Sequence, residues 1–503
     1  MSNRKILTNI FSNWTNFVLL IGIAFVVSPI IVHKLGNERY GIWTLIVSIT
    51  GYFTVLDFGI NTAIVRFVSK YKATNEIEKL RGIYSSSFLF FFIAGIIAML
   101  IIAIFAHFFK DIFGIESISR KYISAVLLIV GIDFSLSLIF SVFLGSLRAL
   151  QEFLAVNIIS ISTSILKNIF IVIALYKGGS LLSLAIIQIS SNIIKYISQH
   201  ILIRKKYAFL SFNLSLCSKQ TFKQIFDYSI YSFLIAVAIK VLFYTDSIVI
   251  GSLLTISDVT FYAIPATIID YLEKLIWAVI SVLIPIISSF EAVGDNKRNS
   301  LIYSVGTKYT LFLALPILIV LFTAGSDFIR LWMGPDYEVR SGNVLKILLI
   351  GYFFALSQLI AHGILKGVSL HKALAYILCI EALANLLLSV ILAKTFGING
   401  VAFGTTLPLI AANLFFIPFY TCKKLDIPYL HYLQKSYTAG FLILVFSVIA
   451  YSKVGILIQS YLALAIYSLF VATTIAIVTF LFILEEEHRI FIINKIKPLL
   501  GQT

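Results

Sequence analysis

Long apolar segments follow one another along the whole chain, with only short polar stretches between them. An apolar run of about 18 or more residues is long enough to cross a bilayer as a helix. The runs predict about fourteen helical spans, near residues 12–32, 41–64, 83–109, 122–146, 153–176, 180–203, 226–254, 259–287, 303–324, 343–365, 373–395, 399–421, 436–458 and 460–484. A membrane barrel would instead show alternating segments of about ten residues. The pattern therefore predicts an all-α polytopic membrane protein.

The first twelve spans divide into two similar halves. GSLRALQEF at Gly145 parallels GILKGVSLH at Gly363, and the same interval separates Gly179 from Gly397. Each half has an even number of spans, so the halves share one orientation, which predicts a parallel repeat with a cavity between two six-helix lobes. Chance similarity between apolar segments is the alternative. The predicted domains are an N-lobe (1–210), a C-lobe (211–425), and an extra helix pair with a cytoplasmic tail (426–503).

Charge sets the orientation of these spans. The chain has 503 residues, of which 60% are hydrophobic and 12% are charged, and its net charge is +16. The basic residues gather in alternate short loops and near both ends, which predicts that both termini are cytoplasmic. Because they form no single patch, we expect no nucleic-acid partner. The three cysteines are far apart, so no disulfide framework and no metal site is predicted.

Two consecutive spans carry polar stripes. Helical spacing places on one face of each span the following residues: Asn157, Ser160, Ser164 and Lys167 in one, and Gln188, Asn192, Lys195 and Gln199 in the other. Charged side chains inside a membrane are costly and rarely face lipid. We therefore expect these stripes to line a wet cavity. The alternative is that the lysines reach the membrane surface, or pair with Asp133 or Glu381 to hold helices together.

Further charges lie within or near the spans. Lys240 and Arg66 extend the predicted cationic lining, although Arg66 lies near a span end and could reach the interface. Seven residues are candidates for coupling to an ion: Asp57, Asp133, Asp246, Asp270, Glu273, Lys274 and Glu381. Asp270 and Lys274 are four residues apart, so a simple intrahelical pair is the alternative for them. The coupling ion would be H⁺ or Na⁺, and no cofactor is predicted.

The loops leave no room for a catalytic domain. The longest predicted external loop runs from Ala324 to Gly342. The sequence has no P-loop, no HExxH and no Gly-x-Ser-x-Gly motif. We therefore expect a transporter rather than an enzyme.

Four segments resemble one family of transporters. VVSPIIVHKLGNERYGIWTL, LDFGINTAIVRFVSKY, YTDSIVIGSLLTISDVTFYAI and RLWMGPDYE are similar to segments of the Wzx-type polysaccharide flippases. These belong to the multidrug/oligosaccharidyl-lipid/polysaccharide exporter superfamily. The resemblance implies a MATE-like fold in the bacterial inner membrane. It also implies movement of an undecaprenyl-diphosphate-linked oligosaccharide to the periplasmic leaflet by alternating access, for O-antigen or capsule synthesis. The sequence leaves open whether the chain works alone or beside a glycan polymerase.

Three other functions stay open at the level of sequence. A multidrug cation antiporter of the same superfamily should have mainly acidic cavity residues, whereas the spans hold Lys167, Lys195, Lys240 and Lys274. A lipid II flippase would also have fourteen spans. A membrane glycan polymerase or ligase would share the lipid carrier but needs a catalytic constellation. Lysine ammonium groups suit a diphosphate, which favours the polysaccharide flippase.

Overall fold

The chain is helical throughout its described part. A computed structural model describes residues 3–280, 283, 287, 290, 296–367, 371–454, 458–487 and 489–490. These residues form long helices joined by short connections, and no strand occurs among them. The prediction of an all-α membrane protein is confirmed. By backbone contacts the chain forms two compact units, Met1–Ile264 with His371–Thr405, and Pro265–Leu370 with Thr406–Thr503.

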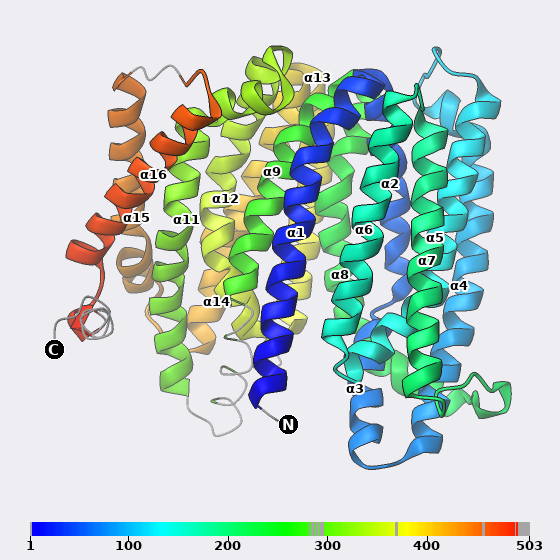
Figure 1. Cartoon of the computed structure of the whole chain (residues 1–503). Helices are drawn as coiled ribbons and strands as arrows, with labels where there is room; N and C mark the ends of the chain where they lie inside the picture. Colours follow the sequence, from blue (N-terminus) through cyan, green and yellow to red (C-terminus); the bar gives the residue numbers. More distant parts are fainter. Residues whose placement is uncertain are drawn as a thin grey trace. The chain divides into compact units, whose positions relative to one another are not determined.

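The first unit contains the helices up to α8 and parts of two more (Figure 1). Its elements are α1 (Asn3–Leu35), α2 (Asn37–Tyr52), η1 (Phe53–Asp57), α3 (Ile60–Ala73), α4 (Ile77–Ile112), α5 (Arg120–Ala149), α6 (Phe153–Tyr176), α7 (Leu181–Lys206), η2 (Leu214–Leu216) and α8 (Lys219–Leu253). Two helices belong partly to it, α9 (Ile256–Ile280) and α13 (His371–Ile410).

The second unit holds the remaining elements. They are α11 (Asn296–Met333), η4 (Pro335–Tyr337), α12 (Glu338–Gly367), the π-helix η5 (Ala411–Phe416), α14 (Ile417–Lys424), α15 (Tyr429–Val454), α16 (Tyr461–Val478) and the π-helix η6 (Thr479–Ile483). The lobe boundaries drawn from the sequence repeat stay a prediction, and the tail after residue 490 lies outside the described residues.

Twelve segments of the described chain are long and apolar enough to cross a membrane. The sequence predicted about two spans more, and the differences lie at α9 and at α13. Helix α9 contains Asp258, Asp270, Glu273 and Lys274, so it is not purely apolar. The segment Lys372–Lys424 counts once, although Gly397 within α13 has φ +57° and ψ −137°, which is not helical. The chain turns back there, as the contacts across this turn described below require.

One predicted span is wrong as a continuous helix. The sequence predicts a span over 41–64, but α2 ends at Tyr52 and a 3₁₀ turn follows. Phe58 (φ +49°) and Gly59 (φ +72°) then adopt left-handed backbone before α3 begins. A left-handed phenylalanine is strained, and its ring stacks on Phe233 at 4.7 Å. Apolar periodicity does not detect such a break.

The longest predicted external loop is also mostly helical. Helix α11 continues to Met333, and α12 begins at Glu338 after one 3₁₀ turn. The guanidinium of Arg330 pairs with Asp327 at 2.8 Å and with Glu338 at 3.3 Å. These ion pairs let charged residues continue the helix beyond its apolar part, which explains why apolar runs alone placed its end too early.

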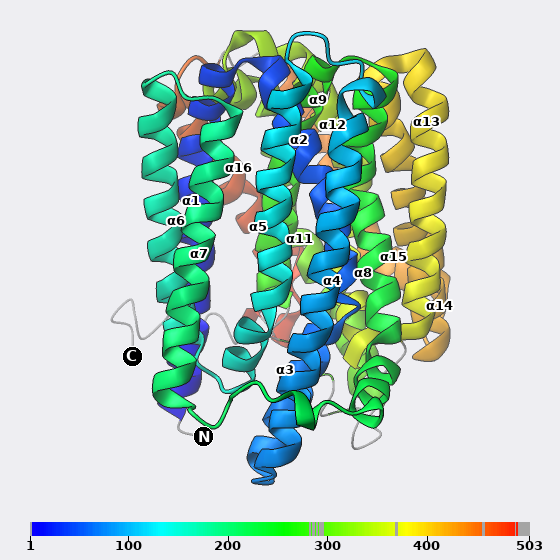
Figure 2. The ribbon, with the colours of Figure 1, turned by 90° about the vertical axis from the view of Figure 1, so that its right-hand side faces the viewer.

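Helices of the first unit pack side by side as long rods (Figure 2). Helix α5 contacts α3, α4 and α7, and α6 contacts α1 and α7. The core between α3, α4 and α5 includes the fully buried Ile64, Leu80 and Leu147. Gly145 permits this close approach, because a Cβ atom there would lie 2.8 Å from the amide oxygen of Asn61. Helix α5 is therefore the central element against which α7 presents its polar face.

A buried polar network joins α15 to α11 and α12 within the second unit. The amide of Gln358 on α12 accepts a hydrogen bond from Tyr303 (3.0 Å) and donates to Tyr432 (2.8 Å) and Tyr437 (2.6 Å). The rings of Tyr303 and Tyr432 stack at 4.6 Å. Buried polar groups are costly unless paired, and here each hydroxyl is satisfied. The network thereby fixes the first of the two C-terminal helices to α11 and α12.

Candidate functional site

Asp133 is the centre of a polar cluster inside the first unit. It lies in the middle of α5 and is 5% exposed. Its carboxylate accepts hydrogen bonds from two side chains of α7, Gln188 (3.0 Å) and Asn192 (2.8 and 3.0 Å). Gln188 and Asn192 are one helical turn apart, so both point from the same face of α7. The polar stripe of α7 therefore faces α5.

Two lysines add positive charge to this cluster. The ammonium of Lys195 donates to the Oδ1 atom of Asn192 at 3.0 Å and lies 5.1 Å from the centre of the Tyr196 ring. Lys167 on α6 is half-buried and interacts electrostatically with Asp133. The amide of Asn192 thus connects a carboxylate to an ammonium group. We call Asp133, Gln188, Asn192, Lys195 and Lys167 the Asp133 cluster.

Other members of the predicted cationic lining lie elsewhere. Asn157 on α6 donates to Ser12 (2.9 Å) and Asn13 (2.7 Å), so it ties α6 to α1. The backbone carbonyl of Ser164 accepts a hydrogen bond from Asn168, one turn later on the same helix, at 2.8 Å, and the Ser164 hydroxyl accepts from it at 3.4 Å. Lys240 on α8 is half-buried, with its ammonium 5.3 Å from the Tyr244 ring.

Arg66 is an exposed residue of α3, with its guanidinium 5.7 Å from the ring of Phe67. In the structure, the polar stripe of α7 contacts Asp133. The polar residues of α6 instead have different neighbours, because Asn157 contacts α1 and Lys167 lies near Asp133. Participation of these residues in a cavity stays a prediction.

A second buried carboxylate, Asp246 on α8, is 5% exposed. Its Oδ2 atom accepts hydrogen bonds from Tyr262 on α9 (2.5 Å) and from Thr405 on α13 (2.8 Å). Ser389 on α13 donates to the Oδ1 atom at 3.4 Å. Within the described chain Asp246 forms no ion pair. Its charge is therefore balanced by hydroxyl groups rather than by a basic residue.

Further oxygen atoms surround this carboxylate. The carbonyl of Val401 accepts from Ser389 (3.4 Å) and Thr405 (3.2 Å). Asn385 donates to the hydroxyl of Thr405 at 2.9 Å, and its Oδ1 atom is buried without a hydrogen-bond partner among the described residues. We call Asp246, Tyr262, Asn385, Ser389 and Thr405 the Asp246 pocket. Hydroxyl, amide, carbonyl and carboxylate oxygens are the donors that hard cations prefer.

The turn in α13 builds this pocket. After the reversal at Gly397, the residues Val401 and Thr405 lie beside Asn385 and Ser389. Gly404 makes the close approach possible, because a Cβ atom at that position would lie 2.5 Å from the backbone nitrogen of Ser389. Sequence reasoning missed Ser389 and Thr405. The detectable signal was a polar pair four residues apart before FGING, Asn385 and Ser389, and the polar residue Thr405 after it.

The remaining acidic candidates have mostly local contacts. Asp57 accepts from the side chain of Asn61 at 2.9 Å, near the start of α3. Asp270 and Lys274 form an ion pair of 2.6 Å within α9, as the intrahelical alternative expected. Glu273 is half-buried beside that pair, and Glu381 is buried on α13. An ion-coupling role for these residues remains untested.

A further question is whether the described residues form a site for a multivalent metal ion. In the part of the chain that the structure describes, no group of three or more His, Cys, Asp or Glu side chains is arranged to hold a metal ion. The oxygen-rich Asp246 pocket contains a single carboxylate. It therefore suits a proton or a monovalent cation better than a multivalent metal.

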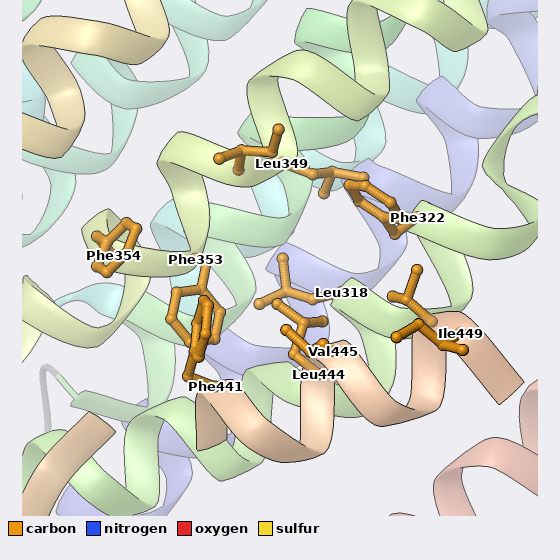
Figure 3. A pocket seen from close by; sticks show the side chains of 11 residues that line it. Leu318, Phe322, Leu349, Phe353, Phe354, Phe441, Leu444, Val445 and Ile449 are labelled. Carbon is orange, nitrogen blue, oxygen red and sulfur yellow. The ribbon is translucent and has the colours of Figure 1, made fainter. Parts of the chain in front are cut away.

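An apolar pocket of about 240 Å³ lies in the second unit, between α11, α12 and α15 (Figure 3). Figure 3 shows the rings of Phe353 and Phe441 close together and the side chains of Leu318, Val445 and Ile449 around the same space. The eleven lining residues are all Leu, Ile, Val or Phe. Such a pocket suits a hydrocarbon chain and has no group to bind a sugar or a phosphate.

Comparison with known proteins identifies the family. Residues 6–291, more than half of the chain, match the family described as "Polysaccharide biosynthesis protein". The chain belongs to this family. A protein of Shigella flexneri with the name "Putative O-antigen transporter" is 24% identical over 392 residues, which cover 77% of this chain and 91% of that protein. The resemblance drawn from the four sequence segments is confirmed.

Solved structures agree on the fold of this polysaccharide biosynthesis protein. A lipid II flippase, MurJ, in an inward closed conformation matches with a TM-score of 0.72 and 15% identity, covering 94% of this chain and 99% of that one. An inward-facing MATE-family multidrug transporter matches with a TM-score of 0.69 and 12% identity, covering 88% and 100%. The chain is a multi-pass membrane transporter with this fold, and it is not an enzyme.

Proposed function

We propose that this transporter is a flippase for a polyprenyl-diphosphate-linked oligosaccharide in O-antigen or capsule synthesis. Family membership and the relative named as an O-antigen transporter support a polysaccharide cargo. The observation that carries the proposal is the Asp133 cluster, where two lysines stand in apolar helices beside one carboxylate. A diphosphate and sugars cannot cross hydrocarbon unaided, and such a cluster offers them ammonium and amide groups.

The Asp133 cluster releases its lysines to the cargo. In the described arrangement Lys195 is held by Asn192, which is held in turn by Asp133. A diphosphate carries more negative charge than one carboxylate, so it competes for the ammonium groups of Lys195 and Lys167. Gln188 and Asn192 then have amide groups for sugar hydroxyls. After release, Asp133 and Asn192 take back the lysine and favour departure of the cargo.

The Asp246 pocket couples transport to a cation. A buried carboxylate without a basic partner is costly, so it takes a proton or a small cation such as Na⁺. Binding of the cation strengthens the contacts between α8, α9 and α13, and its loss weakens them. Movement of the cation down its gradient thereby drives alternation between states that open to opposite sides of the membrane.

The orientation follows the distribution of basic residues. Both termini lie in the cytoplasm of a bacterial cell, and the chain spans the inner membrane. The cargo is collected from the cytoplasmic leaflet and delivered to the outer leaflet. Membrane lipids surround the protein, and a glycan polymerase on the far side consumes the delivered units.

Cells lacking this protein test the proposal. We expect the lipid-linked oligosaccharide to accumulate in the cytoplasmic leaflet, and wild-type protein to clear it. Lys195→Gln should clear it more slowly, whereas Lys177→Gln, which changes an exposed lysine at the end of α6, should behave as wild type.

Accumulation of lipid II would indicate a lipid II flippase instead. Sensitivity to cationic dyes without accumulation would indicate a multidrug antiporter. Accumulation of single repeat units in the outer leaflet would indicate a polymerase or ligase.

A further inference from the structure

A second pocket, of about 510 Å³, lies in the first unit between α4, α5 and α7. Leu210 and Phe212, from the segment 207–218 that joins α7 to α8, are among its lining residues. Figure 2 shows this segment passing below α5 and across the lower part of α4, at the end of the unit where α7 finishes. The backbone of Asn213 donates to Ser85 at 3.0 Å, and Arg81 donates to Ser211 at 3.1 Å. The segment is thereby attached to α4.

Aromatic rings form the walls of this pocket. Phe88 of α4 and Phe212 of the connecting segment lie 5.2 Å apart, between ring centres. Phe140 of α5 and Tyr196 of α7 form a second ring pair, with centres 5.3 Å apart. Ring contacts of this kind fix side chains in place. The walls are therefore arranged in advance to hold an apolar chain.

The mouth of the pocket is cationic. Arg204 is exposed and belongs to the twelve residues that line the pocket, none of which is acidic. Within the described chain, Arg204 has no hydrogen-bond or ion-pair partner. The neighbouring Lys206 differs, because it pairs with Glu152 at 2.9 Å, and Glu152 also accepts from the hydroxyl of Tyr207 at 2.7 Å. The nearby carboxylate is thus occupied, and Arg204 is available to an external anion.

The connecting segment has the composition of a membrane–water boundary. Phe212 is 45% exposed and Leu214 is 61% exposed. The ammonium of Lys72 lies 4.7 Å from the centre of the Phe209 ring. Aromatic residues with lysine and arginine are typical at the depth of lipid headgroups. The mouth of the pocket therefore lies at headgroup depth, and the aromatic walls extend toward the acyl chains.

We propose that this pocket binds an anionic phospholipid, with its phosphate at Arg204 and one acyl chain between the aromatic walls. Basic pockets between membrane helices on the cytoplasmic side bind anionic headgroups in this way. The lipid would be separate from the cargo and would act on α7. Tyr196 forms part of the wall and also lies under the ammonium of Lys195. Occupancy of the pocket therefore stabilises α7, the helix that carries three of the five residues of the Asp133 cluster.

Native mass spectrometry of the purified full-length protein tests this site. Phosphatidylglycerol is the probe, and phosphatidylcholine is the neutral control lipid. One arginine at the headgroup contributes about fivefold in affinity, so Arg204→Gln should weaken phosphatidylglycerol binding by about that factor. Lys205→Gln is the matched control, because Lys205 is exposed on the same turn and does not line the pocket. Arg204→Lys should retain most of the binding.

Two further measurements make the outcome decisive. Phe212→Ala should shorten the retention of phosphatidylglycerol without changing the Arg204 contribution. Free inorganic phosphate should not displace the lipid. Equal loss of binding in the Arg204 and Lys205 variants would overturn the site. Displacement of phosphatidylglycerol by equimolar undecaprenyl phosphate would assign the pocket to the cargo and overturn the separate lipid. Both results are measurements of lipid binding and not of transport. Failure of the lipid site would therefore leave the proposed flippase function untouched, and the transport assay tests that function separately.

Discussion

The hydroxyl of Tyr262 donates a hydrogen bond of 2.5 Å to the carboxylate of Asp246. This bond joins α8 to α9, and the same carboxylate oxygen accepts from Thr405 of α13. Three helices therefore meet at one buried negative charge. Such a charge needs a proton or a cation to be stable in an apolar surrounding.

Asp246→Asn should uncouple transport from the ion gradient. Asparagine has nearly the same size and still accepts the hydrogen bond from Tyr262, but it has no charge to bind a cation. Hydrogen bonds to charged groups contribute about 1.5–3 kcal/mol, so we expect a decrease of about tenfold or more in gradient-driven transport. The measurement is the transport rate with and without an imposed gradient. Asp270→Asn is the comparison, since Asp270 pairs with Lys274. An unchanged gradient response in Asp246→Asn would rule out this residue.

The oxygen atoms around Asp246 should set the apparent affinity for the cation. Thr405→Val and Ser389→Ala each remove a hydroxyl that contacts the carboxylate. With Na⁺ as the coupling ion, we expect the half-saturating concentration to rise by about tenfold in each variant, because a coordinating oxygen is lost. With H⁺ it should fall instead, because both hydroxyls stabilise the charged carboxylate. Thr395→Val is the matched control, because Thr395 is an exposed threonine on the same helix. If Thr405→Val and Thr395→Val titrate alike, the pocket does not bind the coupling ion.

Asp133 and Lys195 should act as a pair. Lys195→Gln removes the ammonium proposed to bind the diphosphate and should raise the apparent KM for the cargo by about tenfold. Asp133→Asn should leave the cargo site more positive and slow release, which lowers the maximal rate rather than the affinity. A double-mutant cycle on transport rates measures the interaction. Additive effects of the two substitutions would show that Asp133 and Lys195 do not interact during transport, which would contradict the release mechanism.

Asn157 is expected to stabilise the fold rather than to bind cargo. Its amide donates to Ser12 and Asn13, which joins α6 to α1. Asn157→Ala leaves these groups unpaired, so the free energy of unfolding should fall by about 1–3 kcal/mol. Thermal unfolding of the purified protein measures this. Asn168→Ala on the same helix loses a contact within one turn, and it should unfold close to wild type. Loss of cargo affinity in Asn157→Ala without loss of stability would contradict this and would indicate that Asn157 binds cargo.

The contact between α2 and α8 should open during transport. Gly251 of α8 lies against Leu45 of α2, since a Cβ atom at Gly251 would be 3.3 Å from the Cγ atom of Leu45. Leu45→Cys with Gly251→Cys therefore brings two thiols within disulfide distance. The native Cys217, Cys379 and Cys422 are free thiols in the structure and would be replaced by serine. Oxidation should stop transport and reduction should restore it. Full transport by the oxidised protein would show that this contact stays closed.

The sequence predicted the class of fold well, because apolar length is a direct requirement of the bilayer. It did not predict the break at Phe58 and Gly59, because a left-handed backbone depends on rings that pack from α8. It placed the end of α11 too early, since the ion pairs of Arg330 bring together residues before and after Gly334. The first error comes from a contact between residues distant in sequence, Phe58 and Phe233. The second comes from ion pairs that stabilise charged residues within the helix.

The candidate site was predicted in part. Helical spacing correctly placed Gln188, Asn192 and Lys195 on one face of α7, and the structure adds Asp133 as their partner. The same rule grouped Asn157 with Lys167, but Asn157 faces α1. Spacing defines which residues share a face, whereas the neighbour of that face depends on the tertiary packing. Ser389 and Thr405 were missed for a similar reason, because only the reversal at Gly397 brings them to Asp246.

The most direct measurement is flipping in proteoliposomes that contain the purified protein and a polyprenyl-diphosphate-linked oligosaccharide. A lectin outside the vesicles reports the oligosaccharide that reaches the outer leaflet. The account predicts that an H⁺ or Na⁺ gradient accelerates its appearance with wild-type protein and leaves Asp246→Asn unaffected. Equal appearance in protein-free vesicles, or no appearance with wild-type protein under either gradient, would contradict the account.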